Sequence, residues 1–248
     1  MTFIYDNHQL IFLILLAVTA FLYSSVGHGG ASGYLALMAL FDFSQDYIRS
    51  TALLLNLFVA AIAFYHFWGK GYFKKRLFLY FAVSSIPFSF IGGLITLNPT
   101  IYHIILGLFL LFSIFKLATK IKSKKYFIKK LNIFQGLIIG SIIGFFSGLI
   151  GIGGGIILSP LIIFMRWGTI KEAAAVSALF IWVNSAAGLI GQYSSGLNLE
   201  YDSYKYIIAV LFGGFFGGLL GSSKLKTSVL KNLLIIVLFF AFIKLILI

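Results

Sequence analysis

Long apolar runs follow one another along nearly the whole chain and leave only short polar segments between them. A helix needs roughly 20 residues to cross the hydrocarbon core of a bilayer. Eight runs approach this length, at residues 10–26, 50–68, 77–97, 101–117, 133–150, 173–192, 205–222 and 229–247. Only 10% of the residues are charged, whereas a soluble domain carries roughly 25%. We therefore expect an all-α polytopic membrane protein with about eight spanning helices.

Two further apolar runs, residues 31–41 and 155–165, are too short to span. As helices they would reach only about 17 Å at a rise of about 1.5 Å per residue. Each follows a glycine-rich motif, which we call the first tip (residues 27–30) and the second tip (residues 151–155). The pattern predicts two broken hairpins, whose short return helices leave the membrane on the side that the chain entered. Full crossing by these short segments is the alternative.

The two halves of the chain repeat one another. Three landmarks recur at similar offsets, with Gly27 and Gly151 124 residues apart, Gly92 and Gly217 125 apart, and Asn56 and Asn184 128 apart. We therefore predict a first membrane repeat over residues 1–118, a basic cytoplasmic linker over 119–130 and a second membrane repeat over 131–248. Inverted repeats place two related hairpins on opposite sides of one central site, as in many secondary transporters.

The distribution of basic residues predicts the orientation. With the N-terminus outside, 16 of the 19 Lys and Arg residues fall on the inner side, and the others are Arg49, Lys205 and Lys244. Cytoplasmic loops of membrane proteins collect Lys and Arg, which explains the formal charge of +13 without a nucleic-acid partner. We expect a multi-pass protein of the inner (plasma) membrane with both termini outside and two repeats of opposite orientation.

The chemistry needed for catalysis is not visible in the sequence. The chain has no cysteine, which excludes disulfides, thiolate metal sites and thiol catalysis. It also shows no membrane-buried acidic pair, no Ser/His/Asp set and no cluster of metal ligands. We therefore expect no enzyme activity, no cofactor and no metal site.

The two tips are the strongest candidates for a binding site. In hydrocarbon an unpaired backbone group costs several kcal/mol, so a broken helix is tolerated only where protein or a water-filled cavity satisfies it. Glycine permits a sharp reversal, and a helix that begins there presents roughly half a positive charge. Two facing tips therefore predict an anion site without Arg or Lys. Glycines that only allow close helix packing are the alternative, which we favour for the pairs at 92–93, 213–214 and 217–218.

The candidate substrate-binding residues combine the tip glycines with neighbouring polar side chains. They are Gly27, His28, Gly29, Gly30, Ser32, Asn56, Gly151, Gly153, Gly154, Gly155, Ser159 and Asn184. The two asparagines lie mid-helix, where an amide either binds a ligand or holds helices together. His28 is also a candidate for proton coupling, because histidine titrates near neutral pH. A neutral His28 that makes a structural hydrogen bond is the alternative.

At these residues the sequence resembles the TauE/SafE family of sulfite and organosulfonate exporters. The resemblance spans nearly the whole chain and includes the motif G-x-G-G-G-x4-P from Gly151 to Pro160. The first tip departs from this motif, with Ala31 and Ala36 in place of the third glycine and the proline. The resemblance implies a lipid-embedded transporter of a small anion, sulfite or an organosulfonate, with the oligomeric state left open. A small-anion channel that uses the same site, or a membrane scaffold without transport, is the alternative.

Overall fold

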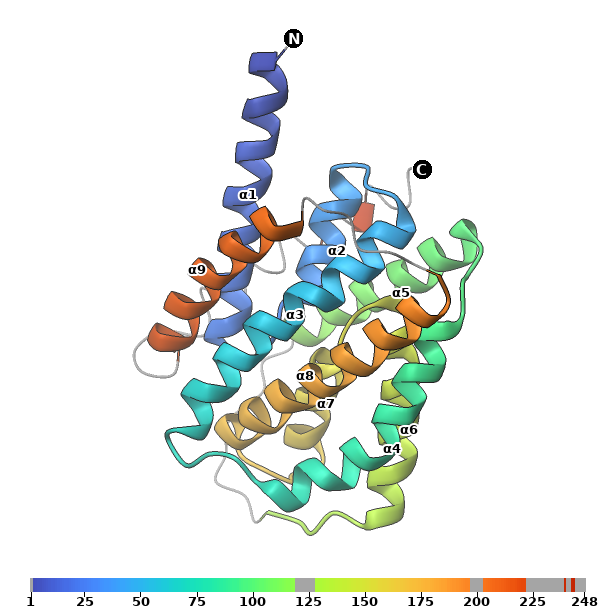
Figure 1. Cartoon of the computed structure of the whole chain (residues 1–248). Coiled ribbons are helices and arrows are strands. Elements are labelled where there is room, and N and C mark those ends of the chain that lie inside the picture. Colours follow the sequence, from blue (N-terminus) through green and yellow to red (C-terminus); the bar gives the residue numbers. More distant parts are fainter. Residues whose placement is uncertain (1, 119–127, 197–202, 222–238, 240–241, 244–248) are drawn as a thin grey trace.

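Every regular element in the described part of the chain is a helix (Figure 1). The computed structural model describes residues 2–118, 128–196, 203–221, 239 and 242–243. The helices are α1 (Thr2–Ser25), α2 (Ala31–Leu40), α3 (Gln45–Trp68), α4 (Lys75–Leu94), α5 (Pro99–Ala118), α6 (Ile133–Ile150), α7 (Gly155–Phe164), α8 (Ile170–Ser194) and α9 (Ser203–Gly221).

Five of these helices, α3, α4, α6, α8 and α9, are long and apolar enough to cross a membrane. The searched parts of α1 and α5 are apolar but shorter, at Gln9–Ser25 and Pro99–Phe112. The expected run at 229–247 and the linker at 119–130 fall mostly outside the described residues. The all-helical, polytopic fold that the apolar runs predict is confirmed.

The two short helices, α2 and α7, begin directly after the glycine motifs, as predicted. Each has ten residues, or about 15 Å of helix. The residue that precedes each helix is a glycine in the left-handed conformation, with φ of 103° at Gly30 and 76° at Gly154. A residue with a Cβ adopts this conformation only at a cost of about 1–2 kcal/mol, so the glycines are needed for the turn.

Contacts between packed helices give their relative directions. Gly140, Gly144 and Gly148 of α6 lie against Phe81, Ser85 and Ser89 of α4, in the same order along both helices. Gly213, Gly217 and Gly221 of α9 lie in the same way against Ala17, Phe21 and Ser25 of α1. The pairs α4·α6 and α1·α9 are therefore both parallel.

The central pair, α3 and α8, is antiparallel. Asn56 contacts Ser185, and Leu53, earlier in α3, contacts Gly188, later in α8. Helix α9 runs parallel to α3, because Gly214 contacts Val59 and Gly218 contacts His66. Helix α8 runs parallel to α4, because Asn184 contacts Ser85 and Gln192 contacts Gly93. Helices α1, α3 and α9 thus run one way, and α4, α6 and α8 run the other way (Figure 1).

Corresponding helices of the two halves, α1 and α6, α3 and α8, and α4 and α9, therefore have opposite directions. This is the arrangement expected of an inverted repeat. Because α6 and α8 run in the same direction, the chain must return between them. Helix α7 lies on that return path, as the hairpin interpretation predicts.

Close packing explains the glycine pairs outside the tips. A methyl group on Gly92 would meet the carbonyl oxygen of Phe145, and one on Gly217 would meet that of Phe21. Gly93 and Gly213 are equally close to backbone carbonyls of neighbouring helices. Without side chains at these positions the helix backbones can approach closely, so their interpretation as packing glycines is confirmed.

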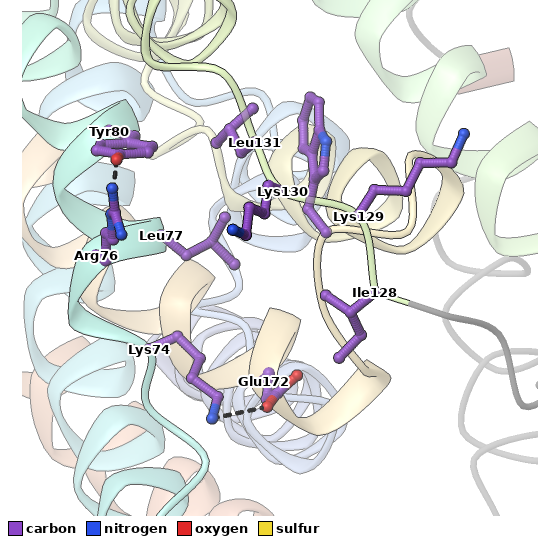
Figure 2. A pocket seen from close by; sticks show the side chains of 10 residues that line it. Lys74, Arg76, Leu77, Tyr80, Ile128, Lys129, Lys130, Leu131 and Glu172 are labelled. Carbon is purple, nitrogen blue, oxygen red and sulfur yellow. Dashed lines mark hydrogen bonds and ion pairs between the residues drawn. The ribbon is translucent and has the colours of Figure 1, made fainter.

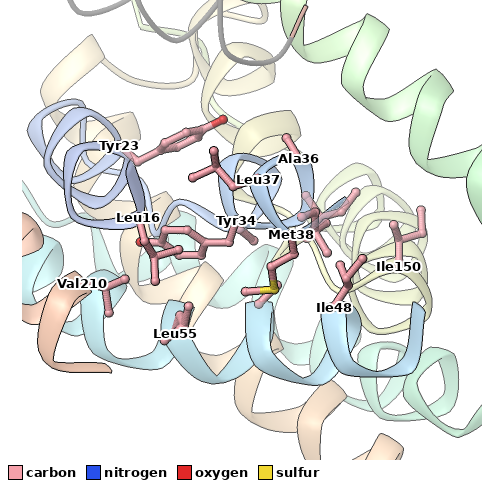
Figure 3. Close-up of a cluster of buried hydrophobic side chains, with 14 of the residues drawn as sticks. Leu16, Tyr23, Tyr34, Ala36, Leu37, Met38, Ile48, Leu55, Ile150 and Val210 are labelled. Atoms are coloured by element: carbon pink, nitrogen blue, oxygen red, sulfur yellow. The ribbon is translucent and has the colours of Figure 1, made fainter. Parts of the chain in front are cut away.

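Helix α2 is buried on all its faces. Residues 31–38 are all buried, and Figure 3 shows Tyr34 and Met38 among Leu16 of α1, Leu55 of α3 and Val210 of α9. A helix that is apolar all round belongs inside the protein or the membrane. The first tip is therefore held inside the helix bundle rather than on its surface.

The helix directions predict which helix ends share a side of the membrane. Single cysteines introduced at Ser44, before α3, and at Ser194, at the end of α8, should react with an impermeant maleimide from one side. A cysteine at Lys75, at the start of α4, should react only from the other side. All three positions are exposed, and the chain has no native cysteine to interfere. Labelling of Ser44 and Lys75 from the same side would contradict the topology.

Candidate functional site

Asn56, in the middle of α3, joins the two tips. Its Oδ1 accepts a hydrogen bond of 3.0 Å from the amide of Ala31, the first residue of α2. Its Nδ2 donates to the carbonyl of Ile152 in the second tip at 3.5 Å and to Ser185 Oγ of α8 at 3.3 Å. The Asn56 side chain is fully buried. One amide therefore satisfies backbone groups of both broken segments.

Glycines of both tips face the same two side chains. A Cβ on Gly29 would collide with Asn56 Oδ1 and would lie 2.9 Å from Cγ2 of Ile181. A Cβ on Gly153 would lie 2.5 Å from Asn56 Nδ2 and 3.0 Å from the same Ile181 atom. The two tips thus meet at the contact between α3 and α8, which agrees with a central site between inverted hairpins.

These contacts make Ile181 the counterpart of Asn56. The two residues are 125 positions apart, close to the 124 that separate the tips. Asn184 lies nearly one turn beyond Ile181, where its Nδ2 donates to Ser85 Oγ at 3.0 Å and to the Phe180 carbonyl at 2.8 Å. It therefore holds α8 to α4 in this structure, and its role in binding a substrate remains a prediction.

The side chains around the first tip are bonded within the protein, whereas the backbone amides of Gly29, Gly30 and Ser32 have no acceptor among the described residues. Ser32 Oγ shares a hydrogen bond of 2.7 Å with the Tyr23 hydroxyl, and the Tyr34 hydroxyl donates to the Gly29 carbonyl at 2.9 Å. Ser24 Oγ donates to the Gly214 carbonyl at 2.7 Å. His28 is half-buried, and its Nδ1 donates to the Val26 carbonyl at 3.1 Å.

The second tip has more buried polar groups without a partner than the first tip. No side chain caps α7. The first residue of α2, Ala31, donates its amide to Asn56, whereas the first residue of α7, Gly155, faces the apolar side chain of Ile181. Among the described residues no acceptor is found for the amides from Gly153 to Ile156.

Three buried serine hydroxyls near this tip also lack a hydrogen-bond partner in the described structure, namely those of Ser147, Ser159 and Ser177. Ser147 and Ser177 lie beside Gly154 and Gly155, and Ser159 is one turn along α7. Of these serines only Ser159 is predicted from the sequence. Ser147, one turn before Gly151, could have been found from its place in the glycine motif, whereas Ser177 comes close only through the packing of α8.

Arg49 is buried, which the sequence analysis did not predict. The charge count assigns it to the outer side, and the structure buries its side chain completely in the second turn of α3. Its Nη2 donates to the carbonyl of Ile95, at the end of α4, at 3.0 Å. The signal that could have revealed it is its position directly before the apolar run at 50–68, where a charge is costly.

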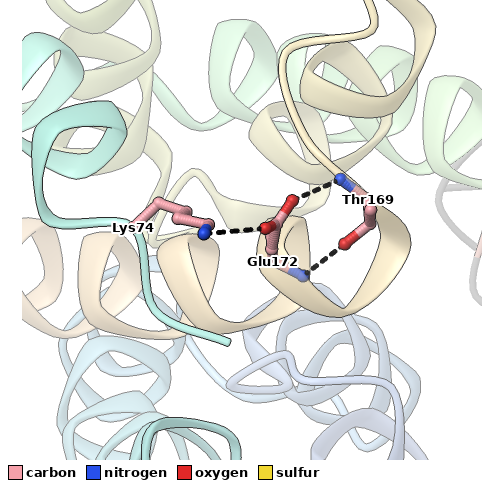
Figure 4. Close-up of polar contacts among 3 residues, drawn as sticks. All are labelled: Lys74, Thr169 and Glu172. Carbon is pink, nitrogen blue, oxygen red and sulfur yellow. Dashed lines mark hydrogen bonds and ion pairs between the residues drawn. The ribbon is translucent and has the colours of Figure 1, made fainter. Parts of the chain in front are cut away.

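A basic cavity of about 430 Å³ opens at the opposite end of the molecule, where α4 and α8 begin (Figure 2). Lys74, Arg76, Lys129 and Lys130 line it, together with Trp167. The neighbouring Glu172 neutralises only part of this charge. It forms an ion pair of 3.2 Å with Lys74 and accepts a hydrogen bond from the Thr169 amide as part of the α8 capping box (Figure 4). The resulting positive field attracts anions.

The family model described as "Sulfite exporter TauE/SafE" matches residues 11–245. The chain belongs to this family. It is 38% identical over 244 residues to the probable membrane transporter protein y4hK of Sinorhizobium fredii, covering 97% of this chain and 99% of that protein. It is 28% identical over 185 residues to the probable membrane transporter protein YunE of Bacillus subtilis, covering 64% and 66%. No solved structure gives a significant match.

The membrane-protein fold of this TauE/SafE protein thus agrees with its family. Among its described residues no group of three or more His, Cys, Asp and Glu side chains is placed to hold a metal ion. The polar groups at its centre are amides, hydroxyls and backbone N–H groups. Such groups can donate or accept hydrogen bonds without carrying a net charge.

The packing around the second tip can be tested by comparing two glycines of similar conformation. Gly153→Ala and Gly71→Ala both place a methyl group at positive φ, 74° and 76°. Gly71 has nothing within 4 Å of that position. The free energy of unfolding of Gly71→Ala should therefore fall only by the conformational cost of about 1–2 kcal/mol. The free energy of unfolding of Gly153→Ala should fall by about 1–3 kcal/mol more, because the methyl group must displace the Asn56 side chain. Unfolding in mixed micelles measures the stability of both variants. Equal losses of stability would contradict the close packing around Gly153.

Proposed function

We propose that this protein is a secondary transporter of a small anion, sulfite or an organosulfonate, that works by alternating access around the two tips. The observation that carries the proposal is the set of buried, unpartnered N–H and hydroxyl groups at the second tip. A buried donor without a partner costs about 1–3 kcal/mol. An anion that accepts several of these hydrogen bonds recovers that cost, with further stabilisation from the N-terminus of α7.

The proposed anion lies closer to the second tip than to the first. Asn56 occupies the first amide of α2 and the hydroxyls of the first tip are bonded within the protein, so less hydrogen-bonding capacity remains there. Ser159 and the glycines from 151 to 155 are the proposed contacts, with Ser147 and Ser177 added by the structure. Gly27 to Gly30, Ser32 and Asn184 stay in the proposal as residues of the opposing hairpin and of the α4–α8 contact.

The basic cavity supports an anionic rather than a cationic or neutral substrate. The positive-inside rule supports a cytoplasmic position for this end, in keeping with the proposed orientation in the plasma membrane with the N-terminus outside. Four cations around one opening raise the local concentration of anions, and this long-range effect is weakened by salt. The relatives named as probable membrane transporters agree with this class of function.

The proposal is tested with purified protein in proteoliposomes loaded with sulfite or sulfoacetate. A transporter should show saturable flux and should exchange unlabelled for labelled anion across the membrane. A channel that uses the same site would show flux that rises with concentration without saturation and no exchange-driven accumulation. Absence of flux for all tested sulfur oxyanions and organosulfonates would leave the scaffold alternative and contradict the proposal.

Serine substitutions distinguish a binding site from a packing device. Ser147→Ala and Ser177→Ala remove hydroxyls that have no partner in the empty protein, so the fold should be unchanged or slightly stabilised. If the hydroxyls bind the anion, its Kd should rise roughly tenfold, as expected for the loss of about 1.4 kcal/mol. Calorimetric titration with sulfite measures the change.

The matched control is Ser24→Ala, which removes a hydroxyl bonded to the Gly214 carbonyl. This variant should lose stability but keep its affinity for sulfite. Unchanged affinity in both folded variants, Ser147→Ala and Ser177→Ala, would show that the anion binds elsewhere.

His28 is the proposed proton-coupling residue, because it is the ionisable side chain within a tip. Histidine changes charge near neutral pH, so transport should depend on pH between about 5.5 and 7.5. His28→Gln should flatten that dependence while the protein stays folded. The same pH profile in the variant and the parent protein, measured as initial rates in proteoliposomes, would exclude His28 from coupling.

A further inference from the structure

Arg49 is a completely buried cation with unused hydrogen-bonding groups. Its side chain is 0% exposed. Of its five N–H donors, those on Nε and Nη1 have no partner, and the bond from Nη2 to the Ile95 carbonyl is the one that the structure describes. Asp46, one turn earlier in α3, is exposed and forms no ion pair with it. Buried charges in proteins are normally paired and hydrogen-bonded, and Arg49 is neither fully paired nor fully bonded.

The surroundings of Arg49 are suited to a cation but do not use its free groups. Helix α4 ends at Leu94, next to Ile95, and α6 ends at Ile150, next to Gly151. Helix C-termini stabilise a nearby positive charge. The carbonyl of Ile150 is bonded to the Tyr102 hydroxyl at 3.3 Å, however, so it does not act as the missing acceptor. The Ile95 carbonyl holds the guanidinium through Nη2, and Nε and Nη1 are left for another ligand.

The backbone of Arg49 lies beside the second tip. A Cβ on Gly151 would be 2.9 Å from the carbonyl oxygen and 3.2 Å from the Cα of Arg49. The first tip makes the equivalent contact with Ala174, since a Cβ on Gly27 would lie 2.5 Å from its Cβ. Arg49 and Ala174 are 125 residues apart, the same offset as Asn56 and Ile181. The two repeats thus carry a buried cation at one of two equivalent positions and a methyl group at the other.

We propose that the Nε and Nη1 groups of Arg49 bind a small oxyanion, a sulfite or a sulfonate group, beside the second tip at the end of the molecule opposite the basic cavity. This second contact deepens the proposed transport function and rests on it. Several oxygens on one sulfur can accept from more than one N–H group, and charge-assisted hydrogen bonds are stronger than neutral ones. Because Ala174 cannot do the same for the first tip, the anion is held more tightly on the Arg49 side of its path.

The chain offers a direct chemical test, because its arginines are Arg49, Arg76 and Arg166. A protein with Arg76→Lys and Arg166→Lys leaves Arg49 as the sole target for phenylglyoxal. Reaction at Arg49 is followed by peptide mass spectrometry with and without sulfite or sulfoacetate. If the anion covers Nε and Nη1, an anion concentration of ten times its Kd should slow the reaction about tenfold, by simple mass action.

Calorimetry on the same protein separates this proposal from the proposed function. Anion binding without any protection of Arg49, or an Arg49 that never reacts, would make Arg49 a structural counter-charge for the helix ends and overturn the proposal. Protection of Arg49 in a protein that shows no flux in proteoliposomes would support the Arg49 site and contradict transport.

Two variants complete the test. Arg49→Lys keeps the charge at the helix ends, so the protein should stay folded, but it lacks the Nε and Nη1 groups and the two side chains are not equivalent at such sites. Its Kd for sulfite should rise at least roughly tenfold. Arg166→Lys, in the loop after α7 and outside both tips and the basic cavity, is the control and should bind as the parent protein does. Parent-like affinity in a folded Arg49→Lys protein would overturn the proposal.

Discussion

The structure depends on how backbone polar groups are satisfied where two helices are broken inside an apolar bundle. Water is not available in hydrocarbon, so each exposed N–H or C=O needs a partner from the protein or from a ligand. Asn56 supplies partners on both sides, an acceptor for the first amide of α2 and a donor for a carbonyl of the second tip. Because α3 and α8 cross where the tips meet, one side chain can reach both broken segments.

The two tips have the same backbone plan but different chemistry. At the position equivalent to Asn56, the second repeat has Ile181, which fills space but accepts no hydrogen bond. The amides at the start of α7 therefore remain without a partner, together with three nearby serine hydroxyls. A structure that served only to hold helices together would be more stable with these groups bonded or replaced by apolar ones. The proposed function accounts for them, because a bound anion would accept their hydrogen bonds.

Much of the fold could be predicted from the sequence, because apolar runs and glycines act locally. The short run at 155–165 is α7, Gly155–Phe164, and the run at 31–41 is α2, Ala31–Leu40. The details of the site could not be predicted, because they depend on how helices are rotated and shifted against each other. Pairing Asn56 with Asn184 by residue type gives an offset of 128, and the contacts with Ile181 give 125. A shift of nearly one turn moves the amide from the tips to the α4–α8 contact.

The difference between the two halves of the chain has a consequence for the proposed path of an anion. The cations at the basic cavity surround an open space, so water and salt weaken their attraction and they act over a distance rather than by tight binding. Arg49 at the opposite end is enclosed by protein, where the effective dielectric is lower and a charge acts strongly but over a short range. An inverted repeat alone would make both ends equivalent. In the proposed path, the two ends differ because the first half of the chain has Arg49 at the position where the second half has Ala174.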